Sequence, residues 1–515
     1  MAHSHYDVIV IGAGHNGLTT AALLCKKGRS VVVIERRDVV GGLCAGEEFH
    51  PGYRSPGVLH DTACVRPGVV DALRLGEHGL EFDPHPSAVF LAQRDGEGFL
   101  LSDDTGTTVG EIERHSTLDA GRYQDYRRFI ERVRGVVGPV LNEVPSDIYE
   151  LPAGAMVELA RQGLALRALG SRDMMQLLRV PPMCVADWMR DWFETELLCA
   201  GMSAPAILGT WCGPWSPGTA ANLLVRECTA GRTVTGGGAA LVHSLERAAR
   251  DLGVEIRTGV AVERIGVKNG TVTGVVLAGG EEITAGAVVS SCDPVTTFLG
   301  LFAAGELPHA LEARITKYRM RGTTAKVHLA LSRPLSFAGR PDLEVEYART
   351  GETLDDQERA FDAVKYRRFS EQPLLDIYVP GVSRSGFAPD GHASVSILVH
   401  FAPHQLDGGW NNDARERLGD AVVAELDAIA PGTSSAIVAR EVLTPADIAE
   451  RYGVTGGHVH HGEHGLDQLI TRPTPETSRY ATPIRGFYLC GGGSHPGGGI
   501  TCAPGALAAR VVSVR

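Results

Sequence analysis

The amino-terminal part of the chain alternates short apolar runs with small and charged residues. The run Tyr6–Ile11, YDVIVI, is rich in β-branched side chains, which is typical of a strand buried on both faces of a sheet. A glycine-rich segment follows, and residues 19–27 continue as a helix that Gly28 can end. Residues 30–34, SVVVI, form a second strand that Glu35 ends. The pattern predicts a strand, a glycine loop, a helix and a second strand in immediate succession.

The glycine loop, G-A-G-H-N-G, has the spacing of a dinucleotide-binding fingerprint. Gly12 permits the tight turn, Gly14 lets the backbone approach a pyrophosphate, and Gly17 lets helix and strand pack closely. The helix amino terminus faces the phosphates with free N–H groups. Glu35, about twenty residues on, should bond an adenosine ribose hydroxyl. Arg36 and the arginine after it could instead favour a 2′-phosphate, and a solvated pair is the alternative.

A second glycine-rich region lies near the carboxy terminus. The stretch FYLCGGGSHPGGGITCAPGALAAR starts as a strand, passes through glycines and enters an alanine-rich helix after Pro504. Glycines let the main chain lie against a flat ring system, and a helix amino terminus aimed at the ring would stabilise negative charge on a reduced flavin. With the doublet Gly41 and Gly42 after the second strand, this region favours FAD over NAD. A glycine-rich surface loop is the alternative.

The middle of the chain has a different pattern. Residues 122–137 and 156–170 carry apolar side chains at three- and four-residue spacing, which predicts helices. Residues 323–332, 374–379 and 393–402 alternate like strands of a sheet that faces the flavin. Most such helices turn their apolar stripe to a core, and peripheral contact with a membrane is the alternative.

Composition narrows the class of protein. With 515 residues, 43% of them hydrophobic, the chain can bury the cores of two interleaved domains. A net charge of −12 without any basic block argues against nucleic acid as a partner. The ten cysteines form no C-x-x-C pair and are expected as reduced core thiols. The first strand pattern leaves no room for a signal peptide, and no apolar run approaches the ~18 residues of a membrane span, so we expect a cytoplasmic protein.

Both ends of the chain resemble a known family. The segments VIGAGHNGL…ERRDVVGG and YLCGGGSHPGGGI…PGALAAR are similar to the two FAD signatures of the phytoene desaturase-like flavoproteins. Within that group the resemblance is to the branch of pyridine nucleotide-disulfide oxidoreductase domain-containing protein 2, in the flavin amine oxidase superfamily. The stretches TVTGGGAALVHSLERAARDLGVEIRTGVAVERI, LVHFAPHQLDGGW and GGHVHHGEHGLDQLITRPTP extend it over nearly the whole chain.

The resemblance implies a set of FAD contacts. Residues expected at the AMP half, the pyrophosphate and the adenine are Gly12, Gly14, Gly17, Glu35, Gly41, Gly42 and Val262. Residues expected along the pyrophosphate, ribityl chain and ring are Gly491, Gly492, Pro496, Gly498, Gly499 and Ile500. Two positions depart from the pattern: Gly492 stands where many relatives carry Asp, and Leu43 where several carry Arg. Affinity for FAD should therefore depend more on backbone contacts and burial.

The expected fold class is α/β, with a Rossmann-type, glutathione-reductase-like FAD-binding domain interleaved with a substrate domain of mixed sheet and helices. The FAD-binding domain is expected over 1–80, 232–300 and 445–515. The substrate domain is expected over 81–231 and 301–444, with the substrate between the two.

Two residues are the catalytic candidates. Lys326 lies on a strand pattern where, by resemblance, flavin amine oxidases carry a lysine that reaches the flavin N5 through water; burial there should lower its pKa. An exposed strand lysine is the alternative. By resemblance, His461 faces the ring together with Gln468 and Arg472.

The predicted roles of other polar residues near these motifs are less specific. Alternation would put His458 and His460 on one strand face, where further ligands could complete a metal site, although no metal is expected. His495 should orient its loop. Cys502 could attach covalently to the flavin, and a core thiol is the alternative.

The expected activity is FAD-dependent removal of a hydride from a hydrophobic, polyene-like or amine-bearing small molecule. No second Rossmann fingerprint appears, so electrons should leave to oxygen or a quinone. The alternatives are a flavin-dependent isomerase or saturase of a polyene, and a flavin-containing interaction protein without turnover.

Overall fold

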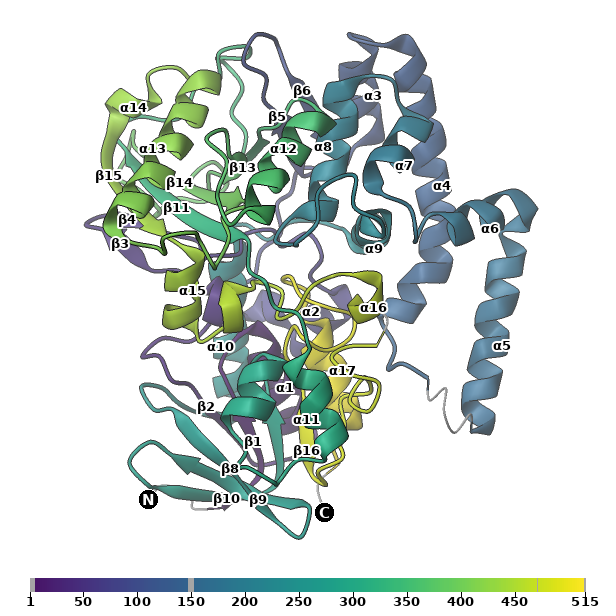
Figure 1. Ribbon diagram of the computed structural model, residues 1–515, viewed down its shortest axis with the longest axis vertical. Helices are drawn as coiled ribbons and strands as arrows, with labels where there is room; N and C mark the ends of the chain where they lie inside the picture. Colours follow the sequence, from purple (N-terminus) through teal and green to yellow (C-terminus); the bar gives the residue numbers. More distant parts are fainter. Residues whose placement is uncertain (1–4, 147–151, 470, 514–515) are drawn as a thin grey trace.

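The computed structural model describes residues 5–146, 152–469 and 471–513. It has two seven-stranded sheets, one above the other in Figure 1, with a group of helices beside the upper one, and a two-stranded sheet of β3 (Glu48–His50) and β4 (Tyr53–Arg54). None of the helices in the described part of the chain has the length and apolar character that a membrane crossing requires.

The first sheet is built around the predicted amino-terminal unit. Its strand order is β7-β2-β1-β10-β9-β8, and β16 pairs with β10. β1 runs parallel to both β2 and β10, with Val8 opposite Val31 and Ala287. The bounds are β1 (His5–Ile11), β2 (Val31–Ile34), β7 (Glu255–Arg257), β8 (Val262–Lys268), β9 (Thr271–Leu277), β10 (Glu282–Ser290) and β16 (Phe487–Leu489).

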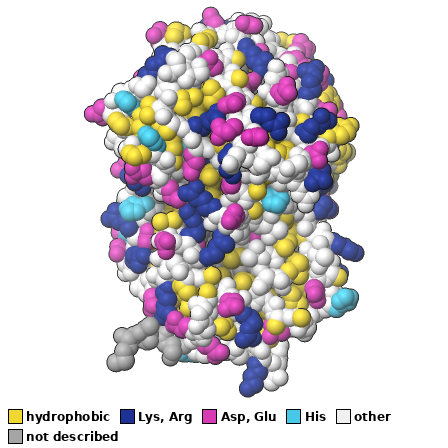
Figure 2. Space-filling model, turned by 60° about the vertical axis from the view of Figure 1, so that its left-hand side comes forward, with side chains coloured by type: hydrophobic (Ala, Val, Ile, Leu, Met, Phe, Trp, Pro, Cys, Tyr) yellow, Lys and Arg dark blue, Asp and Glu magenta, His cyan; other side chains and the backbone are white. Residues whose placement is uncertain are grey.

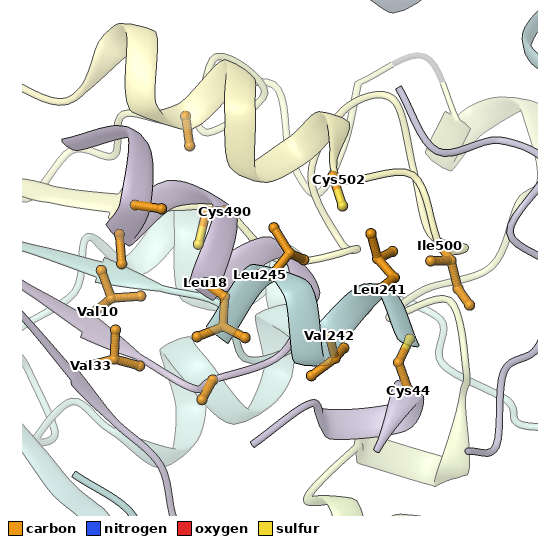
Figure 3. Packing of buried hydrophobic residues seen from close by; sticks show 14 of the residues in the cluster. Val10, Leu18, Val33, Cys44, Leu241, Val242, Leu245, Cys490, Ile500 and Cys502 are labelled. Atoms are coloured by element: carbon orange, nitrogen blue, oxygen red, sulfur yellow. The ribbon is translucent and has the colours of Figure 1, made fainter. Parts of the chain in front are cut away.

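Both faces of this sheet are covered, as the apolar run in β1 predicts. Val8 and Val10 pack in one core cluster with the helices α1 (His15–Lys26), α10 (Gly237–Asp251) and α17 (Ala503–Val511). Figure 3 shows part of this cluster, with Leu18 and Cys490 between Val10 and Leu245. Ile9 and Ile11 point to the other face, where α11 (His309–Thr316) packs.

The second sheet has the order β15-β11-β14-β13-β12-β5-β6 and is antiparallel except for the pair β12 and β5. Its strands are β5 (Ala88–Leu91), β6 (Phe99–Ser102), β11 (Thr324–Leu331), β12 (Tyr347–Arg349), β13 (Leu374–Tyr378), β14 (Ala393–His400) and β15 (Ile437–Leu443). The three strands expected from alternation are confirmed as β11, β13 and β14.

Alternation along β11 separates an apolar face from a polar face, and both are buried. Ala325, Val327 and Leu329 join the core cluster that includes Leu418 and Val422 of α13 (Asn412–Ile429). Thr324, Lys326 and His328 point the other way and are also at most 1% exposed. A polar strand face buried from water needs partners inside the protein, and this face is where the second cavity described below lies.

A helical layer packs beside the second sheet. Its members are α3 (Thr105–Glu113), α4 (Thr117–Leu141), α5 (Ala153–Ala168), α6 (Gly170–Arg179), α7 (Val185–Trp192), α8 (Glu196–Ile207), α9 (Thr219–Thr229) and α12 (Leu354–Lys365). The helices predicted over 122–137 and 156–170 are confirmed as α4 and α5. The expectation that their stripes face a core holds for α4 and is wrong for α5, which buries no residue and projects from the body of the molecule (Figure 1).

The remaining elements are short. They are η1 (Gly42–Cys44), β3 (Glu48–His50), β4 (Tyr53–Arg54), α2 (Pro67–Leu73), η2 (Leu75–His78), η3 (Thr296–Gly300), α14 (Thr433–Ala436), α15 (Pro445–Tyr452), η4 (Thr455–Gly457) and α16 (Leu466–Leu469).

The α/β fold class with a Rossmann-type unit and a mixed sheet with helices is confirmed. The division into domains stays a prediction. Leu311 and Ile315 of α11 pack in the core of the first sheet, beyond the boundary expected at residue 300.

Candidate functional site

A cavity of about 190 Å³, called here the cofactor cavity, lies where β1, β2 and β10 end. Side chains and glycines from three distant parts of the chain meet there, because the carboxyl ends of parallel strands share one edge of a sheet. Predicted site residues that line it are Gly12, Gly14, Glu35, Arg36, Gly41, Gly42, Val262, His461, Gly492, Gly498 and Gly499.

The glycine loop combines close packing with open backbone. A Cβ at Gly17 would lie 2.1 Å from the carbonyl oxygen of Gly12, so Gly17 does not line the cavity but allows α1 to pack on β1. Few atoms stand against Gly14 and Gly42, since a Cβ at Gly14 would find only the Ser291 Oγ at 3.9 Å and one at Gly42 only the Gly14 Cα at 3.4 Å. The backbone of these two glycines is therefore exposed to a ligand.

Glu35 ties the loop together. Its Oε2 accepts a hydrogen bond from the Ala13 N–H at 2.8 Å, and its Oε1 accepts one from the Arg37 N–H at 2.9 Å. A carboxylate oxygen has two acceptor positions, so each oxygen keeps one for a ligand hydroxyl. Glu35 thus shapes the cavity and can also bond a ribose.

The two arginines after Glu35 contact other elements, although Arg36 remains exposed and Arg37 is half-buried. Arg36 Nη2 donates to the carbonyls of Glu450 and Arg451 at 2.9 and 3.1 Å, at the end of α15. Arg37 lies over the Tyr452 ring at 4.7 Å and forms an ion pair with Glu47.

That ion pair is part of a chain that links the two sheets. Glu47 also pairs with Arg451, which pairs in turn with Glu441 of β15 at 3.2 Å. On the face shown in Figure 2, positive and negative side chains are interspersed rather than gathered into one basic surface.

The carboxy-terminal glycines divide between packing and lining. A Cβ at Gly491 would lie 2.6 Å from the Ser291 carbonyl oxygen, so Gly491 serves the contact between β16 and β10 and does not line either cavity. A Cβ at Gly498 would lie 2.4 Å from the His460 Cα, whereas one at Gly499 would meet no atom within 4 Å. Pro496 and Ile500 line a second cavity.

The second cavity, of about 150 Å³, lies between this glycine loop and the polar face of the second sheet. It shares Leu59, Val459, Gly498 and Gly499 with the cofactor cavity. Its remaining lining includes Thr324, Asp376, Leu398 and His400 from the sheet and Pro205, Asn222 and Arg226 from the helices. The two cavities are therefore neighbours across the glycine loop.

Lys326 is buried beside the second cavity, and the alternative of an exposed strand lysine is wrong. It is 0% exposed, and its Nζ lies 3.0 Å from His60 Nδ1. His60 Nε2 lies 3.2 Å from Asp376 Oδ2, and Asp376 Oδ1 accepts a hydrogen bond from Arg349 Nε at 2.7 Å. Four titratable side chains thus form one buried row.

The environment of this row sets its charges. Burial lowers the pKa of Lys326 well below its ordinary value. Burial, followed by the neighbouring Lys326, also lowers the pKa of His60. Burial alone would raise the pKa of Asp376, but Arg349 and His60 together hold it below its ordinary value. With Asp376 ionised, His60 donates from Nε2, and its Nδ1 is left to accept a hydrogen bond from a neutral Lys326 amine.

The expected strand around the histidines is wrong. His458 lies in a turn, where its Nδ1 accepts from the backbone N–H groups of His460 and Gly462 at 3.3 and 3.4 Å. Among the described residues no group of three His, Cys, Asp or Glu side chains is arranged to hold a metal ion. The ring of His460 stacks on that of His464, and these histidines hold the loop instead.

His461 is the histidine of this loop that lines the cofactor cavity. Its Nδ1 is buried without a partner, and burial lowers its pKa. Arg472 and Gln468, expected to face the ring, instead donate to backbone carbonyls, Arg472 to those of Glu463 and Gly462 at 3.2 Å.

Cys502 lies in the core between helices rather than in either cavity. Figure 3 shows it beside Leu241 and Ile500. Burial raises the pKa of its thiol to about 12, so the thiolate that covalent attachment needs is disfavoured. The packing favours the reading as a core thiol. His495 Nε2 lies 3.1 Å from the Val140 carbonyl oxygen, as a residue that orients a loop would.

The sequence did not point to His60, Asp376, Thr324 or His400. Asp376 could have been found from its place in the apolar strand LLDIYV, because a buried strand rarely carries an aspartate unless a partner pairs with it.

The residues of the cofactor cavity fit a bound dinucleotide. Gly14 is the N-cap residue of α1 and provides no side-chain cap, and the first turn has no acidic residue, which leaves its N–H groups for phosphate oxygens. Buried polar atoms without partners, His15 Nε2, Asn16 Oδ1 and His461 Nδ1, stand at the same cavity. Gly14, Gly42 and Gly499 provide bare backbone, and a Cβ at Gly499 would meet no atom within 4 Å.

Comparison with known proteins gives consistent matches along the chain. A model of NAD(P)-binding Rossmann-like domains matches residues 10–64, and one of flavin containing amine oxidoreductases matches residues 112–509. Pyridine nucleotide-disulfide oxidoreductase domain-containing protein 2 of Rattus norvegicus is 32% identical over 98% of this chain and 93% of its own length.

Two further proteins represent more distant similarity. A zeta-carotene-forming phytoene desaturase of Myxococcus xanthus is 27% identical over 99% of this chain and 93% of its own. The solved structure of cyclohexylamine oxidase from Brevibacterium oxydans is 16% identical, with a TM-score of 0.57 over 98% of this chain and 97% of that one. The latter likeness concerns the fold alone.

Proposed function

The chain belongs to the flavin-containing amine oxidoreductase family, as the motifs at its two ends predict, and we propose that it removes a hydride from a hydrophobic or amine-bearing small molecule held in the second cavity. FAD is its cofactor. Similarity to phytoene desaturases supports a hydrophobic substrate as one of the two classes proposed.

One observation carries the proposal. The second cavity is lined largely by apolar groups and shares four residues with the cofactor cavity, two of them the glycines Gly498 and Gly499. A substrate carbon must lie within about 3–3.5 Å of the hydride acceptor for transfer, so a substrate site has to adjoin the cofactor site. An apolar cavity that meets the cofactor cavity at bare backbone satisfies this requirement.

Bound FAD supplies the hydride acceptor for such a reaction. The chain itself supplies orientation and proton management. Asp376 fixes the tautomer of His60, and His60 Nδ1 orients the neutral amine of Lys326, which can then hold or release a proton at Nζ. His461 is the second candidate for a proton-handling group, since it lines the cofactor cavity and its Nδ1 is buried without a partner.

The buried row also supports turnover over a flavin-binding protein without activity. Burying Lys326, His60, Asp376 and Arg349 together costs stability that an apolar core would not lose. Groups with strongly shifted pKa values cluster at functional sites. A polyene isomerase or saturase would use the same residues, so the reaction has to be found by experiment.

The test is an anaerobic titration of the purified flavoprotein. Heat release of the flavin first establishes non-covalent binding. The ten-carbon triene myrcene and cyclohexylamine, both far closer in size to a cavity of about 150 Å³ than a long polyene, then represent the two substrate classes, and loss of the visible flavin band on adding either supports hydride removal. Restoration of the band by air or by a soluble quinone identifies the acceptor, for which we propose oxygen or a quinone. Absence of bleaching with both classes, while product analysis finds an isomerised polyene, would favour the isomerase.

A peripheral contact with a lipid surface is a further part of the proposal. On α5, Met156, Val157 and Leu164 are 60%, 69% and 68% exposed, and Met175 on α6 is 60% exposed. Arg167 and Arg172 near them have no ion pair among the described residues, which suits an anionic membrane. A surface of this kind would bring a hydrophobic substrate to the protein.

A further inference from the structure

The polar atoms of the second cavity are not satisfied by the protein. His400 is 5% exposed, and both of its ring nitrogens lack a hydrogen-bond partner. Thr324 is 1% exposed, and its Oγ1 also lacks one. Both side chains line the cavity. Buried polar groups in native proteins are nearly always paired, so these atoms need a partner from outside the chain.

The two side chains stand next to each other by the register of the sheet. Thr324 of β11 is directly opposite His400 of β14, and directly opposed residues have Cβ atoms about 4.5–5.5 Å apart on one face. One small group in the cavity can therefore touch both. Asn222 adds a fourth unpartnered atom, its Oδ1, and its amide nitrogen donates to the Ala206 carbonyl at 3.1 Å.

The charge state of the cavity indicates what kind of group this is. Burial, together with Arg349, His60 and Lys326, lowers the pKa of His400 to about 4, so the ring is neutral and offers one donor and one acceptor. The threonine hydroxyl also donates and accepts. These donors and acceptors suit either of two ligand groups, a carbonyl oxygen that only accepts a hydrogen bond or a hydroxyl that also donates one.

An ammonium group fits less well. The carboxylates in the lining are already paired, Asp61 with Arg226 at 2.9 Å and Asp376 with Arg349 at 2.7 Å. Arg66, also in the lining, has no ion pair among the described residues and adds positive charge. A pure hydrocarbon fits less well too, because it would leave the polar atoms of His400 and Thr324 desolvated and unpaired.

We propose that the second cavity recognises an uncharged oxygen, a hydroxyl or a carbonyl, on an otherwise hydrophobic substrate, and that His400 and Thr324 are the residues that bind it. This inference rests on the proposed function, because it takes the second cavity as the substrate site. It narrows the substrate class from any hydrophobic or amine-bearing molecule to one that carries such an oxygen.

Phenol and toluene are suitable probes, because they differ by a hydroxyl in place of a methyl group and a cavity of about 150 Å³ accepts a benzene-sized ring. Binding to the flavin-loaded protein is measured by ligand-observed NMR and by perturbation of the flavin spectrum. We expect the wild type to bind phenol roughly tenfold more tightly than toluene. Thr324→Val and His400→Leu should each reduce that preference severalfold without weakening toluene.

Ser396→Ala is the matched control. Ser396 is a buried residue of β14, the strand of His400, and its hydroxyl also lacks a partner, but it does not line the second cavity. It should leave the preference for phenol unchanged. Thr324→Val is nearly isosteric and guards against a folding defect of the histidine variant. All three variants should keep the wild-type flavin content.

Equal binding of the two probes by the wild type, or no phenol binding within its solubility, would overturn the inference. So would a preference that survives in both variants. Lower flavin content in Thr324→Val and His400→Leu would place the polar pair at the cofactor and also overturn it. Failure of the proposed function would look different, since the phenol preference and its loss would persist while no substrate bleached the flavin.

Discussion

The packing of α1 on β1 predicts a sharp effect of Gly17→Ala. The added Cβ would lie 2.1 Å from the Gly12 carbonyl oxygen, well inside the 3.0 Å below which real Cβ contacts essentially never occur. It would also meet the Gly12 carbonyl carbon and the Ser291 Cβ at 3.2 Å. Two of these three atoms are backbone, so the helix itself has to move.

Two effects of opposite sign have to be compared. Alanine in place of glycine in a helix gains about 1 kcal/mol of helix propensity. Overpacking of a core costs about 1–3 kcal/mol, and the upper end applies where backbone rather than a flexible side chain must give way. We therefore expect a net loss of about 2 kcal/mol in the free energy of unfolding and a melting temperature lower by roughly a few degrees.

Displacement of α1 also moves the loop that begins at Gly12, so bound FAD per protein should fall. The assay is thermal unfolding of the protein together with its flavin content after gel filtration. Gly163→Ala is the matched control, because Gly163 lies in α5 with no atom within 4 Å of an added Cβ. There propensity acts alone, and the melting temperature should rise. If Gly17→Ala kept its flavin and melted as high as Gly163→Ala, the assignment of Gly17 to close helix packing would be refuted.

Three more changes test the site and the surface. Lys326→Met should abolish or slow flavin bleaching by substrate and raise the free energy of unfolding at pH 7, because the wild-type lysine gains a proton on unfolding and methionine does not. This gain in stability should shrink as pH rises toward the ordinary lysine pKa, and a gain that does not depend on pH would contradict the buried neutral amine. Glu35→Gln leaves one of two backbone N–H groups without its acceptor, which should lower the free energy of unfolding by about 1–3 kcal/mol and lower the FAD content. Unchanged stability and FAD content would contradict a role of Glu35 in holding the loop. The double variant Met156→Asp and Leu164→Asp should reduce flotation with anionic vesicles while changing the free energy of unfolding by less than about 0.5 kcal/mol. The control Val382→Asp, at a 46% exposed position elsewhere, should float like the wild type, and equal flotation of the double variant and this control would refute the lipid contact.

The sequence predicted those parts of the fold in which local pattern and tertiary environment agree. The run YDVIVI is apolar at every position that the structure buries, and Val8 and Val10 pack on one face while Ile9 and Ile11 pack on the other. The glycine spacing also works locally, since Gly12 and Gly17 meet across a single turn between strand and helix. Short-range geometry of this kind is fixed by a few neighbouring residues.

The second cavity was not predictable in the same way. Its polar residues from the sheet come from separate strands, Thr324 from β11, Asp376 from β13 and His400 from β14, and only the sheet register brings them together. The wrong expectation of a histidine strand has a local cause. His458 bonds the backbone of its own turn, an interaction that competes with strand formation and that alternation of residue types does not reveal.

The buried polar face of β11 joins the two parts of the proposed chemistry. Thr324 lines the second cavity, Lys326 follows two residues later in contact with His60, and His328 comes next, 5.3 Å from the Phe49 ring. Alternation places these three side chains in one row on the face that looks toward the cofactor-binding half. Recognition of a substrate oxygen at Thr324 and control of a proton at Lys326 then lie one strand repeat apart, about 7 Å. A ligand bound at the first residue is therefore held at a fixed distance from the second, and the rigidity of a sheet buried on both faces keeps that distance.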